Sequence, residues 1–310
     1  MSIQEATATS AVFVVGVSRS GTTLMRRVLE GSSRVAVCAE NHYLGHLLGS
    51  EGVRHRLGAL GDLRRDDVVD RVVEYIYGSG LERSSRLRGM SRQWVWTRRH
   101  VPSAEFRTRL LQSDRTERAV FEAMLRAYAD RRGKPIMGEK TPAHLRYVDT
   151  LLGWFPGGRV VHMMRDPRAI YLSELRRRRR EPGSVVFRAL RSTGPVLAAV
   201  VLVQTTAAWL EGAVRLRRHR RRSPDRYLLV RFEDLVAEPE REIRRLCDFL
   251  GIPFEEPMLE QMVVSGGRNA GEQGFDAAAA TRWRGELGGP AAAWFRFWTG
   301  RQRQELGYGD

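Results

Sequence analysis

The stretch Gly16-Val17-Ser18-Arg19-Ser20-Gly21-Thr22-Thr23 decides the fold of this chain. An apolar, β-branched run at 11–15 precedes it, and a helix-forming run at 24–29 follows it. The order strand, glycine-bounded loop, helix is the context in which loop amides and a helix N-terminus bind a phosphate. The lysine of triphosphate-binding loops is missing after the second glycine, and Arg19 supplies a charge inside the loop instead. The missing lysine and the charge of Arg19 favour a loop that binds a smaller terminal anion than a Mg²⁺-bound triphosphate.

The rest of the chain predicts an α/β protein around this loop. Apolar runs at 12–15, 34–37, 159–164 and 227–230, with a fifth at 136–137, read as strands separated by helical patterns such as 116–131 and 240–250. We expect a P-loop-like, doubly wound parallel sheet with helices on both faces and helical insertions. The predicted single domain, 1–310, has a core at about 11–48, 135–180 and 225–260, insertions at about 49–130 and 181–222, and a C-terminal loop and helix at 263–310.

The composition is strongly basic and almost free of lysine. Of 52 basic residues only Lys134 and Lys140 are lysine, and the net charge is +16. Arginine runs at 176–180 and 215–222 suit solvated helix ends, and they also suit an anionic ligand, acceptor or membrane surface. No recognised nucleic-acid-binding motif stands beside these runs, so specific nucleic-acid binding is not expected.

The chain shows no sequence feature of secretion. Two cysteines, Cys38 and Cys247, give no disulfide framework, and residues 1–10 do not read as a signal peptide. The most apolar stretch, 195–203, is too short to span a bilayer and reads as a buried helix, with peripheral membrane contact left open. We expect a cytoplasmic protein.

Two further blocks carry chemistry. Gly138-Glu139-Lys140-Thr141-Pro142 places a rare lysine at a strand end, where α/β folds bind ligands. In the second block a strand ends before Arg165, and Ser173 lies about two helical turns further on. A guanidinium fork and a hydroxyl form a natural pair for one phosphate, while Asp166 reads as a helix N-cap.

Three blocks in this order, 14–27, 165–173 and 227–235, resemble sulfotransferases that use 3′-phosphoadenosine 5′-phosphosulfate (PAPS). The first block is especially similar to the protein-tyrosine sulfotransferase branch and its bacterial relatives. The resemblance implies a transferase that leaves adenosine 3′,5′-bisphosphate (PAP) as product and needs no metal. The acceptor would carry a hydroxyl, as a sugar, lipid, peptide tyrosine or small metabolite does.

The resemblance also implies roles for single residues. Arg19, Ser20, Gly21, Thr22 and Thr23 would bind the 5′-phosphosulfate. The remaining predicted positions are Arg165 and Ser173 for the 3′-phosphate, Arg282 for the cofactor, Glu40 as the catalytic base and Lys140 at the bridging oxygen of the leaving group. In the resemblance the family's motif G-E-E-T-R matches Cys38-Ala39-Glu40-Asn41-His42, so Ala39 replaces the acidic predecessor of Glu40 and His42 replaces the following arginine.

Sulfuryl transfer would pass in line through a loose transition state, with Glu40 taking the acceptor proton and Lys140 and Arg19 stabilising developing charge. Other interpretations stay open for the same residues: His42 as the base, Glu40 as a carboxylate at a helix N-terminus, or Glu40, His42 and His46 as metal ligands. For the whole chain the alternatives are a kinase-like, nucleotide-binding phosphotransferase and a non-catalytic anion- or nucleic-acid-binding protein with a decayed cofactor site.

Overall fold

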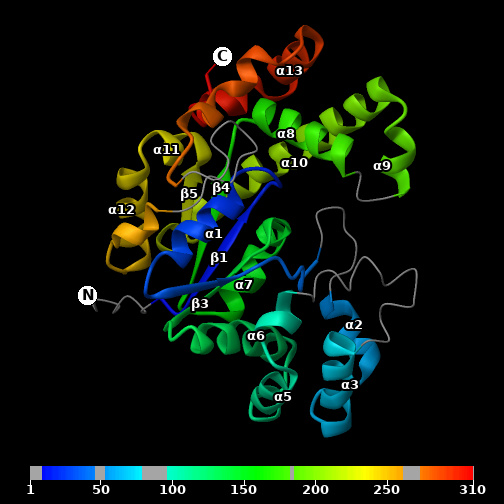
Figure 1. Ribbon diagram of the computed structural model, residues 1–310, viewed down its shortest axis with the longest axis vertical. Coiled ribbons are helices and arrows are strands. Elements are labelled where there is room, and N and C mark those ends of the chain that lie inside the picture. The colour runs from blue at the N-terminus through cyan, green and yellow to red at the C-terminus, as the bar shows by residue number, and fades with distance from the viewer. Residues whose placement is uncertain (1–8, 46–52, 79–95, 182–184, 261–272, 310) are drawn as a thin grey trace. The chain divides into compact units, whose positions relative to one another are not determined.

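The computed structural model describes residues 9–45, 53–78, 96–181, 185–260 and 273–309 (Figure 1). Its strands are β1 (Ala11–Gly16), β2 (Val35–Cys38), β3 (Ile136–Lys140), β4 (Gly158–Met164) and β5 (Tyr227–Arg231). They form one parallel sheet in the order β2-β3-β1-β4-β5. The predicted α/β class and all five predicted strands are confirmed.

Helices fill the connections between the strands. The α-helices are α1 (Thr22–Glu30), α2 (Val53–Leu60), α3 (Asp66–Tyr77), α5 (Ser103–Leu111), α6 (Glu117–Arg131), α7 (Val148–Trp154), α8 (Pro167–Arg180), α9 (Val185–Leu190), α10 (Gly194–Arg222), α11 (Phe232–Ala237), α12 (Pro239–Leu250) and α13 (Gly289–Glu305). The 3-10 turns are η2 (Pro142–Tyr147), η3 (Pro224–Arg226), η4 (Glu256–Met258), η5 (Ala277–Ala280) and η6 (Arg282–Gly285). Residues 96–100 are also helical. Part of the predicted C-terminal loop, 263–272, lies outside the described residues.

Contacts within the chain divide it into two compact units. The first comprises Met1–Val15, Ser32–Val160 and Leu250–Ile252, and the second comprises Gly16–Gly31, Val161–Phe249 and Pro253–Asp310. A single domain over the whole chain stays a prediction.

The first unit is built on β3, which pairs in parallel with β1 on one side and β2 on the other. Helix α6 packs against β2 and β3, and α5 packs against α6. The α6 pattern works as predicted: Thr116 caps the helix by accepting from the Ala119 amide, and the apolar positions are buried. Aromatic rings fill the core, with Phe13 5.3 Å from Phe155 and Phe121 5.0 Å from Tyr43 between centroids.

The second unit carries the long helix α10, which packs against α8, α13 and β5. Its apolar core includes Tyr171, Leu175, Leu197, Val201 and Phe295. The run 195–203, expected to be a buried helix, forms the start of α10 and is buried on one side only. Val196 and Val203 stay 48% and 51% exposed, because the neighbouring elements cover a single face of this helix.

We predict that Gly138→Ala destabilises the first unit. Gly138 lies in β3 between two strands, and an added Cβ would sit 2.8 Å from the Val12 carbonyl oxygen and 3.2 Å from Val37. Backbone in a sheet has little room to move, so we expect a loss of about 1–3 kcal/mol in the free energy of unfolding, measured with urea.

The matched control is Gly58→Ala, an exposed glycine in α2 whose added methyl group meets no atom within 4 Å. It should leave the stability unchanged or raise it by up to about 1 kcal/mol. If both alanine variants change the free energy of unfolding equally, crowding at β3 does not affect stability.

Candidate functional site

The predicted phosphate loop links β1 to α1 and has the backbone of an anion-binding nest. Gly16 and Gly21 have φ of 153° and 95°, and Arg19 is left-handed at 72°. A side chain at Gly16 would place Cβ 2.4 Å from the Met163 carbonyl oxygen, and one at Gly21 would lie 2.5 Å from the Phe232 ring. Only glycine fits at both positions, so they let the loop pack tightly against β4 and α11.

The loop also leaves polar groups for a ligand. Helix α1 begins after Gly21 without a side-chain cap, so no capping side chain competes for its first amides. Ser20 is fully buried, and its hydroxyl has no hydrogen-bond partner among the described residues. A buried hydroxyl in that state indicates a missing partner, and a phosphate or sulfate oxygen would fit that role.

Arginines converge beside this loop in the second unit. Arg19 donates through Nε to Ser173 Oγ at 3.0 Å, and Arg165 Nη1 lies 3.5 Å from the Arg19 carbonyl oxygen. The structure therefore brings together Arg19, Arg165 and Ser173, which the sequence places up to 154 residues apart. Ser173 is the predicted partner of Arg165, and it contacts Arg19 directly.

Arg165 is held by three neighbours that are not acidic. Its guanidinium stacks on the Phe232 ring at 4.0 Å and donates to the Ala279 carbonyl oxygen at 2.7 Å, and its own carbonyl accepts from Trp209 at 2.9 Å. Nε is buried and has no partner among the described residues. This cation is positioned rather than neutralised.

The charge around Arg165 favours an anion. Burial lowers the pKa of Arg165 to about 10; Glu233 opposes this shift, and the charges of Arg19 and Arg176 add to it. Arg176 lies at the start of the predicted arginine run, and its other contact is an ion pair with Glu286 at 2.6 Å. Three guanidinium groups that disfavour one another would be stabilised by a phosphate between them.

Glu233 is a residue of this cluster that sequence reasoning missed. One carboxylate oxygen accepts from the Asp166 amide at 2.9 Å, and the other is buried without a partner among the described residues. Burial raises the pKa of Glu233 to about 7, against the Asp166 hydrogen bond and the charge of Arg165. Glu233 therefore fixes the start of α8, where Asp166 caps the helix by accepting from the Arg168 amide at 2.8 Å.

Arg282, the last predicted cofactor contact in this unit, forms an ion pair with Asp276 at 2.8 Å. Its neighbour Trp283 is buried and stacks on Arg168 at 4.0 Å. The same segment reaches Arg165 through Ala279, so it packs onto the arginine cluster. A direct role of Arg282 at a cofactor stays a prediction.

The other predicted catalytic residues meet in the first unit. Lys140 Nζ donates to one carboxylate oxygen of Glu40, and His42 Nε2 lies 3.4 Å from the other. Glu40 is 40% exposed and Lys140 only 7%. Burial raises the pKa of Glu40, but the His42 hydrogen bond and the Lys140 charge outweigh burial and lower it to about 2. Glu40 is therefore ionised at every physiological pH.

A buried network behind this pair fixes the segment that carries Glu40. Glu139 accepts from Thr141 Oγ1 with one oxygen and meets His144 Nδ1 at 3.1 Å with the other. Thr141 Oγ1 accepts from the Asn41 amide at 3.2 Å, and His144 Nε2 accepts from the Leu44 amide at 3.2 Å. These three side chains are fully buried and hold residues 41–44 from both ends.

The strand register relates Lys140 to the phosphate loop along the chain. Lys140 pairs with Val14, which precedes the first loop glycine by two residues. Cys38 pairs with Glu139, and Glu40 follows Cys38 by two residues. Within the first unit, Lys140 is the last residue of β3 and Glu40 follows β2, so both lie at the carboxyl ends of parallel strands, where α/β folds bind ligands.

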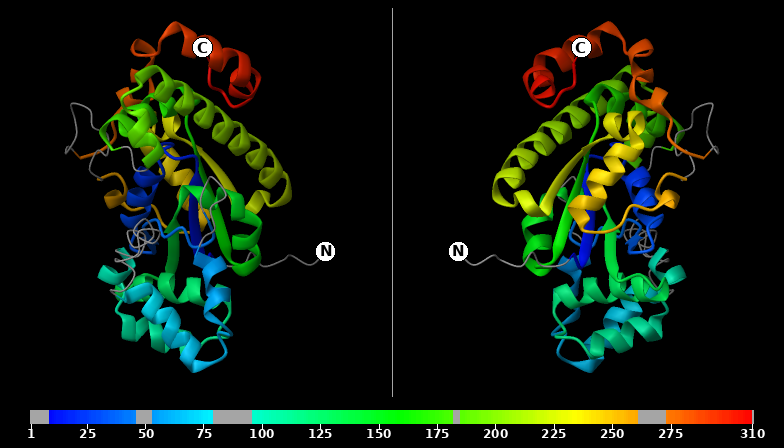
Figure 2. Two further views of the ribbon diagram at one scale, coloured as in Figure 1. Left: turned by 90° about the vertical axis from the view of Figure 1, so that its right-hand side faces the viewer. Right: turned by 90° about the vertical axis from the view of Figure 1, so that its left-hand side faces the viewer.

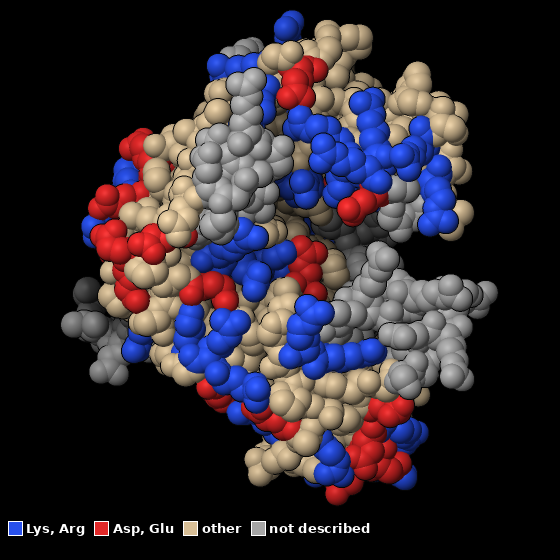
Figure 3. Space-filling model, in the orientation of Figure 1, with Lys and Arg blue, Asp and Glu red and all other residues tan. Residues whose placement is uncertain are grey.

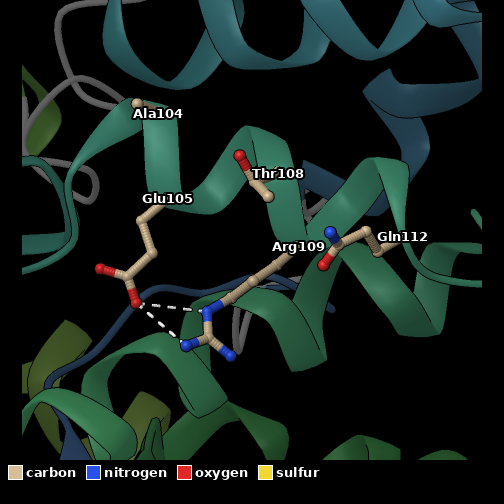
Figure 4. Close-up of a pocket in the computed structure, with 5 residues that line it drawn as sticks. All are labelled: Ala104, Glu105, Thr108, Arg109 and Gln112. Carbon is tan, nitrogen blue, oxygen red and sulfur yellow. Dashed lines mark hydrogen bonds and ion pairs between the residues drawn. The ribbon is translucent and has the colours of Figure 1, made fainter.

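Two other features stand outside these clusters. A surface pocket on α5 is lined by Ala104, Thr108, Gln112 and the Glu105–Arg109 ion pair at 3.1 Å, and it contains none of the predicted residues (Figure 4). Among the described residues no group of three or more His, Cys, Asp and Glu side chains could hold a metal ion. His46, one of the alternative metal ligands, lies outside the described residues.

Comparison with known proteins places these features in context. The sequence model of the Sulfotransferase family matches residues 11–256. Human carbohydrate sulfotransferase 5 is 33% identical over 125 residues, which are 34% of this chain and 26% of that protein. Omega-hydroxy-beta-dihydromenaquinone-9 sulfotransferase Stf3 of Mycobacterium bovis is 26% identical over 47% of this chain and 36% of its own length. The matches thus span about a quarter to a third of these curated relatives.

A solved structure resembles the whole chain. The sulfotransferase domain from the olefin synthase of Synechococcus PCC 7002 superposes with a TM-score of 0.57 and 21% identity, over 99% of this chain and 98% of that one. At this identity the likeness establishes the fold.

We predict that Thr141→Val destabilises the first unit, because the shape is kept while two hydrogen bonds of the buried network are lost. Leaving the Asn41 amide and one Glu139 oxygen unpaired should cost about 1–3 kcal/mol of the free energy of unfolding. Thr108→Val, at an exposed position on α5, is the matched control and should change stability by less than about 0.5 kcal/mol. If Thr141→Val leaves the free energy of unfolding in urea unchanged, the buried network does not position the segment that carries Glu40.

Proposed function

Because the chain belongs to the sulfotransferase family, we propose that it moves a sulfuryl group from PAPS to an acceptor hydroxyl. The observation that carries the choice of donor is the arginine cluster. Arg19 donates to Ser173, the charges of Arg19 and Arg176 act on Arg165, and the uncapped start of α1 and the Ser20 hydroxyl offer a second set of donors. Two anion-binding sets suit a ligand with a 5′-phosphosulfate and a separate 3′-phosphate.

The residues present fit that donor molecule. The loop 19–23 would hold the phosphosulfate through amides and hydroxyls, and Arg165 and Ser173 would hold the 3′-phosphate. PAPS supplies an activated sulfuryl group whose leaving group is already a stable anion. The protein then has to align donor and acceptor and stabilise charge, tasks for which fixed amides and guanidinium groups suffice.

Glu40 and Lys140 would supply the proton chemistry. In the free protein the His42 hydrogen bond and Lys140 together lower the pKa of Glu40 to about 2, which makes that carboxylate a weak base. If Lys140 turns to the bridging oxygen of the donor, Glu40 loses its counterion and becomes more basic. We propose that donor binding thereby activates Glu40 to take the acceptor proton.

The acceptor is proposed only as a class. Two of the relatives are named as a carbohydrate sulfotransferase and as an omega-hydroxy-beta-dihydromenaquinone-9 sulfotransferase. Carbohydrates and omega-hydroxy compounds both carry hydroxyl groups, and this chain should act on an alcohol as well. The kinase-like alternative and the non-catalytic alternative make different predictions for the ligands below.

The first test of this function is ligand selectivity. We predict that calorimetry shows tight binding of PAP and much weaker binding of ATP with or without Mg²⁺. Arg165→Ala should lower the affinity for PAP by roughly 10- to 100-fold, the contribution of one charge-assisted hydrogen bond. The affinity for adenosine 5′-monophosphate should stay almost unchanged. Arg296→Ala, at an exposed position on α13, is the control.

Preference for Mg²⁺–ATP would favour the phosphotransferase instead. If Arg165→Ala lowers the affinities for PAP and for adenosine 5′-monophosphate equally, Arg165 does not bind the 3′-phosphate. PAP binding without sulfuryl transfer to any alcohol of a broad panel would favour the non-catalytic protein.

The second test concerns the base. Glu40→Gln keeps the shape and removes the proton acceptor, so kcat should fall by about 10²–10⁴-fold with the affinity for PAP nearly unchanged. His42→Ala should have a smaller effect, because His42 supports the carboxylate from 3.4 Å. Full activity of Glu40→Gln together with an inactive His42→Ala would transfer the role of base to His42.

The third test concerns Lys140. Arginine keeps the charge, but its broad guanidinium cannot replace a compact ammonium in a position that is only 7% exposed. We predict that Lys140→Arg lowers kcat strongly and changes the PAP affinity little, because the contact strengthens in the transition state. Lys134→Arg, just before β3, should be silent; kinetics in which both substitutions are equally harmless would leave Lys140 without a catalytic role.

A further inference from the structure

Helix α10 carries an exposed apolar stripe that the proposed reaction does not use. Val196, Val203 and Val214 are 48%, 51% and 57% exposed, and they recur at helical spacing on one line. Further small or apolar residues at least partly exposed continue it: Ala199, Ala207 and Leu210. At 1.5 Å per residue the stripe is about 27 Å long. Figure 2 shows α10 as the long yellow-green helix.

The opposite face of α10 is committed to the second unit. Leu197, Val201, Trp209 and Leu216 are buried, and the Trp209 indole donates to the carbonyl oxygen of Arg165. Among the described residues α10 is the one helix long and apolar enough to cross a membrane by length and composition. Its buried face packs on α8, α13 and β5, so the helix lies on the protein with one side outward.

Arginines flank the stripe at both ends. At the C-terminal end Arg217, Arg218 and Arg221 are exposed and continue the line of the three valines. Before its N-terminal end lie exposed Arg188 and Arg191. The residues 185–222 hold eight arginines and a single acid, Glu211, which pairs with Arg215 at 2.8 Å. Figure 3 shows basic side chains gathered over α8 and α9 as well.

Helix α9 extends the apolar surface. Its Phe187 is buried against the core that α10 shares, whereas Val185 and Val186 are 76% and 66% exposed. Exposed valines next to exposed arginines thus occur on both helices. An apolar strip bordered by arginine is the arrangement of helices that lie in a membrane interface, where apolar side chains enter the acyl boundary and cations meet lipid phosphates.

We propose that the outward faces of α9 and α10 bind an anionic membrane surface. A second copy of the chain is a poorer occupant, since arginines border the stripe at both ends. Either a parallel or an antiparallel pairing of two such stripes sets arginine against arginine. A bilayer with negative headgroups covers the valines and neutralises both arginine groups at once. This proposal does not rest on sulfuryl transfer.

The experiment is co-sedimentation of the full chain with vesicles of phosphatidylcholine alone and of phosphatidylcholine mixed with phosphatidylglycerol. We expect binding to the mixed vesicles that weakens as salt is raised, because the arginine contribution is screened. Val196→Glu with Val203→Glu should reduce the affinity by about tenfold or more, since two apolar contacts are lost and two repelled charges are gained.

Two further variants make the result specific. Ala59→Glu adds one exposed negative charge to α2 in the first unit and should leave binding almost unchanged. Val196→Gln with Val203→Gln removes apolar surface without adding charge and should give an intermediate loss. Thermal unfolding and PAP binding of each variant report whether the fold is intact.

Three outcomes would overturn the proposal. The wild-type chain does not bind the mixed vesicles at low salt, or the double glutamate variant binds as well as wild type. Alternatively, the wild type elutes as a dimer and the double variant as a monomer without vesicle binding, which makes the stripe a contact between copies. Loss of folding in both double variants would also count against it, because it would mean that the valines are needed inside the protein.

Discussion

The burial of a cation, Arg165, is the constraint on which the second unit depends. Burial lowers the pKa of Arg165 and makes its placement costly; the charge of Glu233 opposes the shift, and the charges of Arg19 and Arg176 add to it. Its support comes from parts of the chain far apart in sequence: the Phe232 ring of α11, the Ala279 carbonyl of η5 and the indole of Trp209. These contacts explain why α10, α11 and the C-terminal segment all pack at the corner between β4 and α8.

The first unit contains a buried group of the opposite charge, the carboxylate of Glu139. Glu139 has both oxygens satisfied by Thr141 and His144, and those two side chains in turn accept from backbone amides of 41–44. Because side chains alternate along a strand, Lys140 points away from this network and reaches Glu40 instead. One short strand end thus positions the segment that carries the candidate base and also supplies its counterion.

The sequence predicted the strands and the phosphate loop because both depend on local patterns. Apolar runs of four to six residues mark buried parallel strands, and glycines at 16 and 21 mark a loop whose backbone no other residue could adopt. Family resemblance gave Arg165, Ser173, Glu40 and Lys140, which the structure places in two clusters. Their roles in catalysis stay predictions.

Features that depend on long-range packing could not be predicted. Glu233 reads as an ordinary acid in the first turn of a helix, and only the structure shows it buried against the Asp166 amide. The contact of Ser173 with Arg19 joins residues 154 positions apart. The apolar run 195–203 was misjudged because composition alone does not reveal which side of a helix its neighbours cover. The valines of α10 have the same chemistry on both sides, and packing decides which ones face outward.

The pKa of Glu40 links the proposed removal of the acceptor proton to the proposed stabilisation of the leaving group. The His42 hydrogen bond and Lys140 lower the pKa of Glu40 to about 2, and Lys140 is also the residue proposed to stabilise the leaving group. As long as Lys140 stays with Glu40, the carboxylate binds a proton poorly, so it is also a poor base for activating a water molecule as a nucleophile. A donor that attracts Lys140 removes the counterion, and burial, which by itself raises the pKa of Glu40, then acts with less opposition. Under the proposed role of Lys140, the base strength of Glu40 would rise when the donor is bound, which is a physical reason for pairing these two residues in the free protein.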